Sequence, residues 1–173
     1  MTEAPLLRRL GSLAYEALIV VALVFLASFP IAALISPRSP DGVYLAAPDL
    51  TGRVFSFLAL FAVGAAYFTW CWSAGRRTLP MKTWQLALRD TSGAPLHMKQ
   101  ALARYLAAWI GPLAAVGVYA LAAPHGLGAL AWPVAMANWL AALPDPRRAF
   151  LHDRIAGTQL VLQPRMPRPT PAP

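Results

Sequence analysis

Four long stretches without a charged residue dominate the hydropathy pattern of the chain. The first reaches from Ala17 to Pro37, and the others cover residues 54–74, 105–124 and 127–143. A run of about 20 apolar residues is long enough to cross the hydrocarbon core of a bilayer as a helix. The pattern therefore predicts four membrane-spanning helices, at about residues 10–35, 54–74, 105–123 and 127–143.

Prolines interrupt three of these four runs. Pro30 lies late in the first, Gly111 and Pro112 lie in the third, and Pro133 lies near the centre of the fourth. Proline lacks a backbone N–H and bends a helix at the point where it occurs. We therefore expect kinked helices rather than four straight rods.

The polar segments predict a small cap beside the helices. Residues 83–89 alternate partly between apolar and polar side chains and are followed by a turn at residues 90–93, which favours a short strand. Residues 159–162 could form a second strand. An amphipathic interfacial helix is the alternative for the first of these segments. The predicted fold is an all-α membrane protein, a four-transmembrane-helix bundle over residues 1–163. Residues 75–104 and 145–162 would form its cytoplasmic cap, with a possible two-stranded β element.

Charge predicts the orientation of this bundle. With the N-terminus inside, all of the 15 basic residues except Arg38 and Arg53 fall on the inner side. Basic residues concentrate in cytoplasmic loops, so both termini are expected in the cytoplasm. Residues 164–173 hold five prolines and predict a disordered tail.

The composition agrees with a membrane location. Hydrophobic residues make up 58% of the 173 residues and charged residues 13%, which is too apolar for an ordinary soluble fold. The net charge of +8 is spread along one membrane face, so anionic lipid head groups are the expected partner. No nucleic-acid interface is predicted, because a basic groove with stacking aromatic residues is absent from the pattern.

Glu16 is the main candidate for chemistry. It lies inside the first predicted helix, two turns after Arg9 and on nearly the same face. A carboxylate at that depth costs about 2.5–3.5 kcal/mol on insertion scales unless it is paired or protonated. Two interpretations stay open: an ion pair between helices that fixes their packing, or a carboxylate that binds a proton or a cation. The side chains expected to partner Glu16 are Arg9, Arg104, His152 and Arg154, with Tyr15 and Tyr105 as hydrogen-bond donors.

A second charged cluster follows the fourth run, at His152, Asp153 and Arg154. Gly157 and Thr158 come directly after it and predict a left-handed turn into a strand. Asp153 is expected to pair with Arg76, Arg77 or Arg104. The other histidines lie far away in the sequence, so no metal site or cofactor is predicted. No nucleophile with a supporting base is evident, so we expect no enzyme.

Three segments in this order resemble the RDD family of bacterial membrane proteins. They are residues 9–16, residues 77–104 and residues 150–158. The resemblance maps the arginine and two aspartates of the family name onto Arg9, Glu16 and Asp153, and Glu16 departs from the pattern by one methylene. It implies a multi-pass protein of the bacterial inner membrane and, for some members, transport or cation/proton exchange.

Two functional hypotheses follow. The first is a small transporter or cation/proton exchanger for an unknown small solute or cation, in which Glu16 binds and releases the ion. Four kinked helices are few for a complete pathway, so a homo-oligomer is expected. The second is a non-transporting scaffold whose buried charges are structural.

Overall fold

A computed structural model describes residues 4–35, 48–145 and 149–163 of the chain. Within these ranges, three helices are long and apolar enough to cross a membrane. The first is α1 (Leu6–Ile35) and the second is α2 (Leu50–Trp72). The third candidate span, Met98–His125, consists of α4 (Met98–Ala108), α5 (Ile110–Ala122) and the 3₁₀ turn η1 (Ala123–His125). The predicted tail, at residues 164–173, lies outside the described residues.

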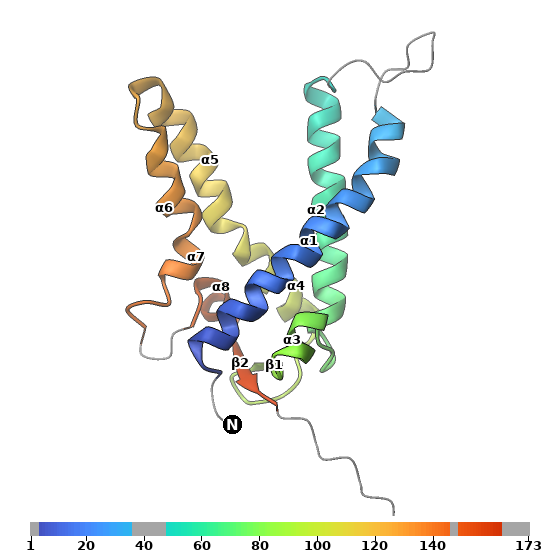
Figure 1. Ribbon diagram of the computed structural model, residues 1–173, viewed down its shortest axis with the longest axis vertical. Coiled ribbons are helices and arrows are strands. Elements are labelled where there is room, and N and C mark those ends of the chain that lie inside the picture. Colours follow the sequence, from blue (N-terminus) through green and yellow to red (C-terminus); the bar gives the residue numbers. More distant parts are fainter. Residues whose placement is uncertain (1–3, 36–47, 146–148, 164–173) are drawn as a thin grey trace, which may run out of the picture.

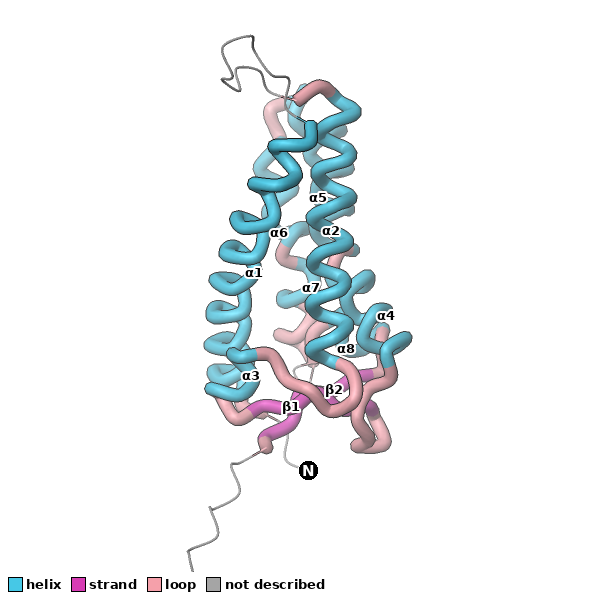
Figure 2. The backbone as a smooth tube through the Cα atoms, turned by 90° about the vertical axis from the view of Figure 1, so that its right-hand side faces the viewer, coloured by secondary structure: helices cyan, strands magenta, loops and turns pink. Residues whose placement is uncertain are grey.

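The helices rise as two arms from one common end (Figure 1). One arm holds α1 and α2, and the other holds α5 and α6 (Ala131–Ala135). At the common end lie α3 (Leu79–Thr83), α8 (Leu151–Ile155) and the two strands. Figure 2 shows the same arrangement from the side, with the strands below the long helices.

The starts of the first three predicted helices were too late. The first helix begins at Leu6 rather than near residue 10, the second at Leu50 rather than at residue 54, and the third at Met98 rather than at Tyr105. Charge-free windows miss an amphipathic first turn, and here Lys99 and Arg104 are helical. The α4 start is capped locally, because the side-chain oxygen of Gln100 accepts the backbone N–H of His97 at 3.3 Å.

The fourth predicted spanning helix is not confirmed. Residues 127–143 form three short pieces instead, η2 (Gly128–Leu130), α6 and α7 (Ala137–Leu140). Pro133 cannot donate a helical hydrogen bond and sits in the middle of this run. The broken segment runs beside α5, to which α6 is packed (Figure 1).

The predicted bend near Pro112 is present as a break between α4 and α5 at Trp109. Pro112 has no N–H to give to the carbonyl of Ala108, four residues earlier. The side-chain nitrogen of Asn138, in α7, donates to that carbonyl at 2.6 Å. Asn138 therefore satisfies a backbone group that would otherwise be costly in an apolar environment.

The predicted strands form a two-stranded antiparallel sheet. β1 (Leu86–Asp90) pairs with β2 (Thr158–Leu162), from Leu86 opposite Leu162 to Asp90 opposite Thr158. The alternative prediction, an amphipathic interfacial helix, does not apply to β1, and the only helix close before it is the short α3. The turn after β1 is closed by Asp90, whose Oδ1 accepts the N–H groups of Ser92 and Ala94.

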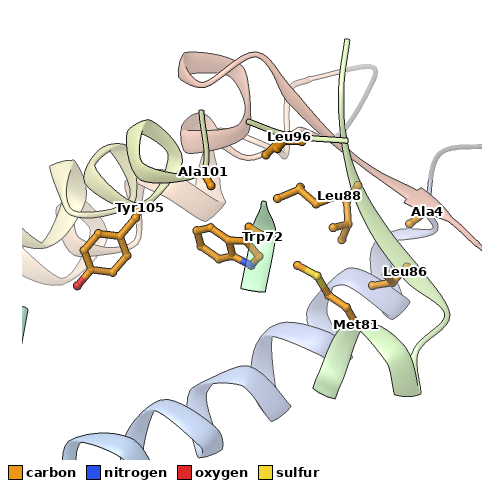
Figure 3. Packing of buried hydrophobic residues seen from close by; sticks show 9 residues of the cluster. Ala4, Trp72, Met81, Leu86, Leu88, Leu96, Ala101 and Tyr105 are labelled. Carbon is orange, nitrogen blue, oxygen red and sulfur yellow. The ribbon is translucent and has the colours of Figure 1, made fainter. Parts of the chain in front are cut away.

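The hydrophobic core lies at the sheet end of the molecule, not among the arms. Its buried side chains come from the end of α2, from α3, from both strands and from α4 (Figure 3). Farther along the arms large apolar side chains are exposed, among them Leu18 at 67%, Leu121 at 78% and Trp132 at 71%. Such surfaces suit contact with lipid or with another protein.

Candidate functional site

An ion pair between α4 and α8 is the centre of the charged region. The Nε atom of Arg104 donates to Oδ1 of Asp153 at 2.8 Å, and both side chains are buried. The hydroxyl of Thr158, at the start of β2, donates to the same oxygen at 3.2 Å. The predicted left-handed turn at Gly157, with φ of 62°, brings Thr158 back to Asp153. Among its three predicted partners, Asp153 therefore pairs with Arg104.

Arg104 has two further partners. Its Nη2 atom lies 3.2 Å from Nε2 of His152, and its guanidinium carbon lies 4.2 Å from the ring centre of Trp72. Because a guanidinium can only donate, Nε2 has to accept, so His152 is neutral and carries its proton on Nδ1. Its 3.8 Å approach to Asp153 is thus not an ion pair.

The pKa values of the two α8 side chains follow from this geometry. Burial lowers the pKa of His152 to about 4, and the positive charge of Arg104 acts in the same direction. Burial alone would raise the pKa of Asp153. The positive charge of Arg104 and the hydrogen bonds from Arg104 and Thr158 outweigh it and hold the pKa of Asp153 below its usual value. At neutral pH, α8 therefore presents a neutral histidine and an ionised aspartate.

Glu16 is not part of this ion pair. It lies ten residues into α1, roughly 15 Å along the helix axis from its start. Glu16 forms no ion pair with any described residue, and its Oε1 atom is buried without a hydrogen-bond partner. Arg104 is the strongest electrostatic neighbour of the carboxylate, followed by the Thr78 hydroxyl and the Trp72 indole.

Glu16 faces a cavity of about 490 Å³ that is lined by α1, α2, α3, α4, α7, α8 and β2. Most of its wall is apolar or aromatic, and its polar side chains include Glu16, Arg104, Asn138 and His152. In the described part of the chain, five buried side-chain atoms lack a hydrogen-bond partner. Four of them belong to residues that line this cavity: Glu16, Trp72, Asn138 and His152. Unsatisfied polar groups gathered around one cavity are typical of a site that receives a ligand or water.

Arg9 turns toward the sheet rather than toward Glu16. Its Nε atom donates to the carbonyl of Ala4 at 2.8 Å and its Nη2 atom to the carbonyl of Leu160 at 3.5 Å. Arg9 and Leu160 border the Glu16 cavity and also a second, more polar pocket of about 610 Å³. They therefore form part of the partition between the two spaces.

Two other predicted partners, Arg154 and Tyr105, do not pair with Glu16, although Tyr105 borders the same cavity. Arg154 is exposed and lines only the second pocket. The hydroxyl of Tyr105 donates to the carbonyl of Phe61 at 2.9 Å. The structure thus joins Arg104, His152 and Asp153, and it leaves Glu16 and Arg9 on separate parts of the cavity wall.

The sequence interpretation missed Trp72, Thr158 and Asn138. A signal existed for Asn138, because it is the polar residue of the fourth apolar run and Pro112 leaves a carbonyl in need of a donor. No comparable signal pointed to the Trp72 ring over Arg104. Among the residues that the structure describes, no three His, Cys, Asp or Glu side chains are grouped closely enough to hold a metal ion.

The order of these features along the chain matches one protein family. The sequence profile of the RDD family matches residues 3–157, a span that includes Arg9, Glu16, Arg104 and Asp153. The chain belongs to the RDD family. No curated protein and no solved structure is similar enough to count as a match. For this RDD protein, the cavity geometry is therefore the main guide to function.

Proposed function

We propose that this RDD protein is a small membrane transporter that exchanges a cation for a proton at Glu16. The observation that carries the proposal is the position of the carboxylate. Glu16 lies on the wall of a cavity within the helices and has no ion-pair partner among the described residues. A carboxyl group in that setting can be neutralised by a proton or by a cation that enters the cavity.

Arg104 would neutralise Glu16 if it were free to approach. The structure commits it to Asp153, to Nε2 of His152 and to the face of Trp72. These contacts supply the guanidinium with one full counter-charge and two further interactions. Arg104 therefore contributes positive potential at Glu16 without forming an ion pair with it.

The two pockets suggest how an ion would reach the carboxylate. Arg9 and Leu160 separate the Glu16 cavity from the polar pocket beside the sheet. The two residues of this partition are in contact, because Arg9 donates a hydrogen bond to the carbonyl of Leu160. A modest movement of Arg9 would connect the two spaces. Transport also requires alternating access, which we expect from a homo-oligomer of this chain.

The proposed setting is the inner membrane of a bacterium with both termini in the cytoplasm. Of the basic residues that the structure describes, Arg53 is at the far end of α2, and the others are at or near the sheet end. A basic end of this kind suits contact with anionic lipid head groups.

A scaffold without transport activity is the second candidate, and the Arg104–Asp153 pair favours it. This pair is buried and hydrogen-bonded between α4 and α8, as a structural ion pair would be. In a scaffold, the basic end would bind lipid or a partner and Glu16 would only influence packing.

Flux in proteoliposomes distinguishes the two candidates. Full-length protein is reconstituted with a pH-sensitive dye in the lumen, and Na⁺, K⁺ or tetraethylammonium is added outside. Exchange of one monovalent cation for one proton is electroneutral, so the lumen should become more alkaline with at least one of these cations. Glu16→Gln should abolish the change, Glu16→Asp should retain part of it, and Asp90→Asn, at the end of β1 and outside the cavity lining, should match the wild type. Equal flux in Glu16→Gln would remove the mechanism, and absence of flux with all three cations would favour the scaffold.

A further inference from the structure

The lining of the Glu16 cavity restricts which cation it could hold. Hard metal cations such as Ca²⁺ and Mg²⁺ take six or more oxygen ligands when they are bound. The described lining offers few side-chain oxygens, and they belong to Ser12, Glu16, Tyr105 and Asn138. One of these, the Tyr105 hydroxyl, already donates to Phe61. The cavity is therefore poorly suited to replace the hydration shell of a bare metal ion.

The same lining is rich in aromatic rings. The rings that border the cavity include those of Phe57, Phe61, Phe68, Tyr105, Trp109 and Trp139. Several of these rings pack against each other, with centres 5.6 Å apart for Phe57 and Trp109 and 5.2 Å apart for Phe61 and Tyr105. Aromatic faces attract organic cations and also accommodate an apolar body. The guanidinium of Arg104 over the Trp72 ring is a cation–π contact of this kind in the same wall.

Glu16 borders the cavity and has no counter-charge among the described residues. Arg104 is paired with Asp153, and His152 is neutral because its Nε2 atom accepts from Arg104. Arg9 directs its guanidinium to the carbonyls of Ala4 and Leu160. One negative charge within apolar and aromatic walls is complementary to an ion with one positive charge inside an apolar body.

From this combination we infer that the cavity binds a monovalent organic cation with an apolar body, such as a quaternary ammonium or phosphonium ion. The inference rests on the proposed function for its transport role, but the binding site can be tested alone. The volume of about 490 Å³ lies within the usual range for small-molecule sites. Size and charge sign then set specificity: an anion of equal shape is excluded by Glu16.

The test is equilibrium binding to the purified full-length protein in detergent, with two probes of nearly equal shape and opposite charge. Radiolabelled tetraphenylphosphonium is the cation, and tetraphenylborate is the anion. The cation should bind the wild type at least about tenfold more tightly than the anion. Its affinity should fall as the pH is lowered, because protons compete for Glu16, and His152 remains neutral above about pH 5.

Variants separate this site from unspecific partition into detergent. Glu16→Gln should weaken cation binding at least about tenfold, and Glu16→Asp should retain it, which shows that the fold is intact. Trp109→Leu removes a ring from the cavity wall and should weaken binding, whereas Trp132→Leu removes an exposed ring outside it and should not. Unchanged binding in Glu16→Gln, or tighter binding of the anion, would overturn the inference.

The two proposals fail in different ways. If Na⁺ or K⁺ drives proton flux that requires Glu16 while tetraphenylphosphonium does not bind, the exchanger stands and the organic substrate class is wrong. If tetraphenylphosphonium binds through Glu16 but none of the three cations moves protons across the vesicle membrane, the site stands and transport is wrong.

Discussion

The two acidic residues of the charged region, Asp153 and Glu16, have opposite surroundings. Asp153 lies at the well-packed sheet end, 2% exposed, and accepts hydrogen bonds from Arg104 and Thr158. Glu16 lies on a cavity wall among helices that expose much of their apolar surface, and its Oε1 atom has no partner among the described residues. One carboxylate is held in a closed network, and the other is left available.

Because their surroundings differ, the two carboxylates are expected to have different roles. Removing one member of a buried, hydrogen-bonded ion pair leaves an uncompensated charge, so Asp153 is expected to matter for stability. Replacing an unpaired carboxylate removes a desolvation cost, so Glu16 is expected to matter little for stability and strongly for ion binding.

The largest expected effect is on the free energy of unfolding of Asp153→Ala. Arg104 would remain buried without its counter-charge, so we expect a loss of about 3–5 kcal/mol. Glu16→Gln, measured in the same detergent by chemical unfolding, should be unchanged or more stable than the wild type. If Glu16→Gln were as destabilised as Asp153→Ala, the contrast between the two carboxylates would be wrong.

The neutral state of His152 predicts a pH dependence of stability. The pKa of His152 is about 4 in the folded protein and near 6.5 when unfolded, so between these values the unfolded chain binds more protons. Stability should therefore fall as the pH is lowered from about 6.5 toward 4, by roughly 3 kcal/mol in total. The lowered pKa of Asp153 adds a loss of the same sign at lower pH. Unfolding of His152→Gln should be less dependent on pH in the upper part of this window, and an identical profile would contradict the assignment.

A smaller effect is expected at Asn138, whose side-chain nitrogen binds the Ala108 carbonyl. Asn138→Leu should lower the free energy of unfolding by about 1–3 kcal/mol, because the carbonyl is left unsatisfied in an apolar environment. Thr69→Val is the matched control, since its buried hydroxyl has no partner among the described residues. We expect that change to be neutral or stabilising. Equal losses in both variants would show that the Asn138 bond is not special.

The smallest expected effect is at Gly157, which turns the chain from α8 into β2 with φ of 62°. Gly157→Ala places a Cβ in a left-handed conformation and should cost about 1–2 kcal/mol. Gly117→Ala, in α5, meets nothing within 4 Å and should be neutral or slightly stabilising by the helix propensity of alanine. Both midpoints can be read from thermal unfolding, and a larger loss at Gly117 would contradict the turn argument.

The sequence predicted the parts of the fold that follow from local pattern. The long apolar runs located α1, α2 and most of the third span, and alternation with a turn located both strands. The fourth run is not confirmed as a spanning helix, because hydropathy counts apolar residues and does not weigh what Pro133 does to a helix of 17 residues. The start of the third helix was predicted too late, because the first turns of α4 contain charged residues that a search for apolar runs leaves out.

The candidate site was predictable in its residues but not in its pairing. Burial and charge singled out Glu16, Arg104 and Asp153, yet the sequence could not show that Arg104 turns to Asp153 and leaves Glu16 to the cavity. That choice depends on long-range geometry, in which β2 and α8 return to the base of α4. The cavity itself is lined by seven elements, α1, α2, α3, α4, α7, α8 and β2, that are distant in sequence, so no local pattern could reveal it.

The central claim is that a proton and a cation compete for the carboxylate of Glu16. The most direct test adds tetraphenylphosphonium, and separately Na⁺ and K⁺, to the detergent-solubilised protein in a weakly buffered solution and counts the protons released. We predict that at least one of these cations releases up to about one proton per wild-type chain near neutral pH and none from Glu16→Gln. Equal release from both proteins, or no release from the wild type at any pH between about 5 and 9, would contradict the account.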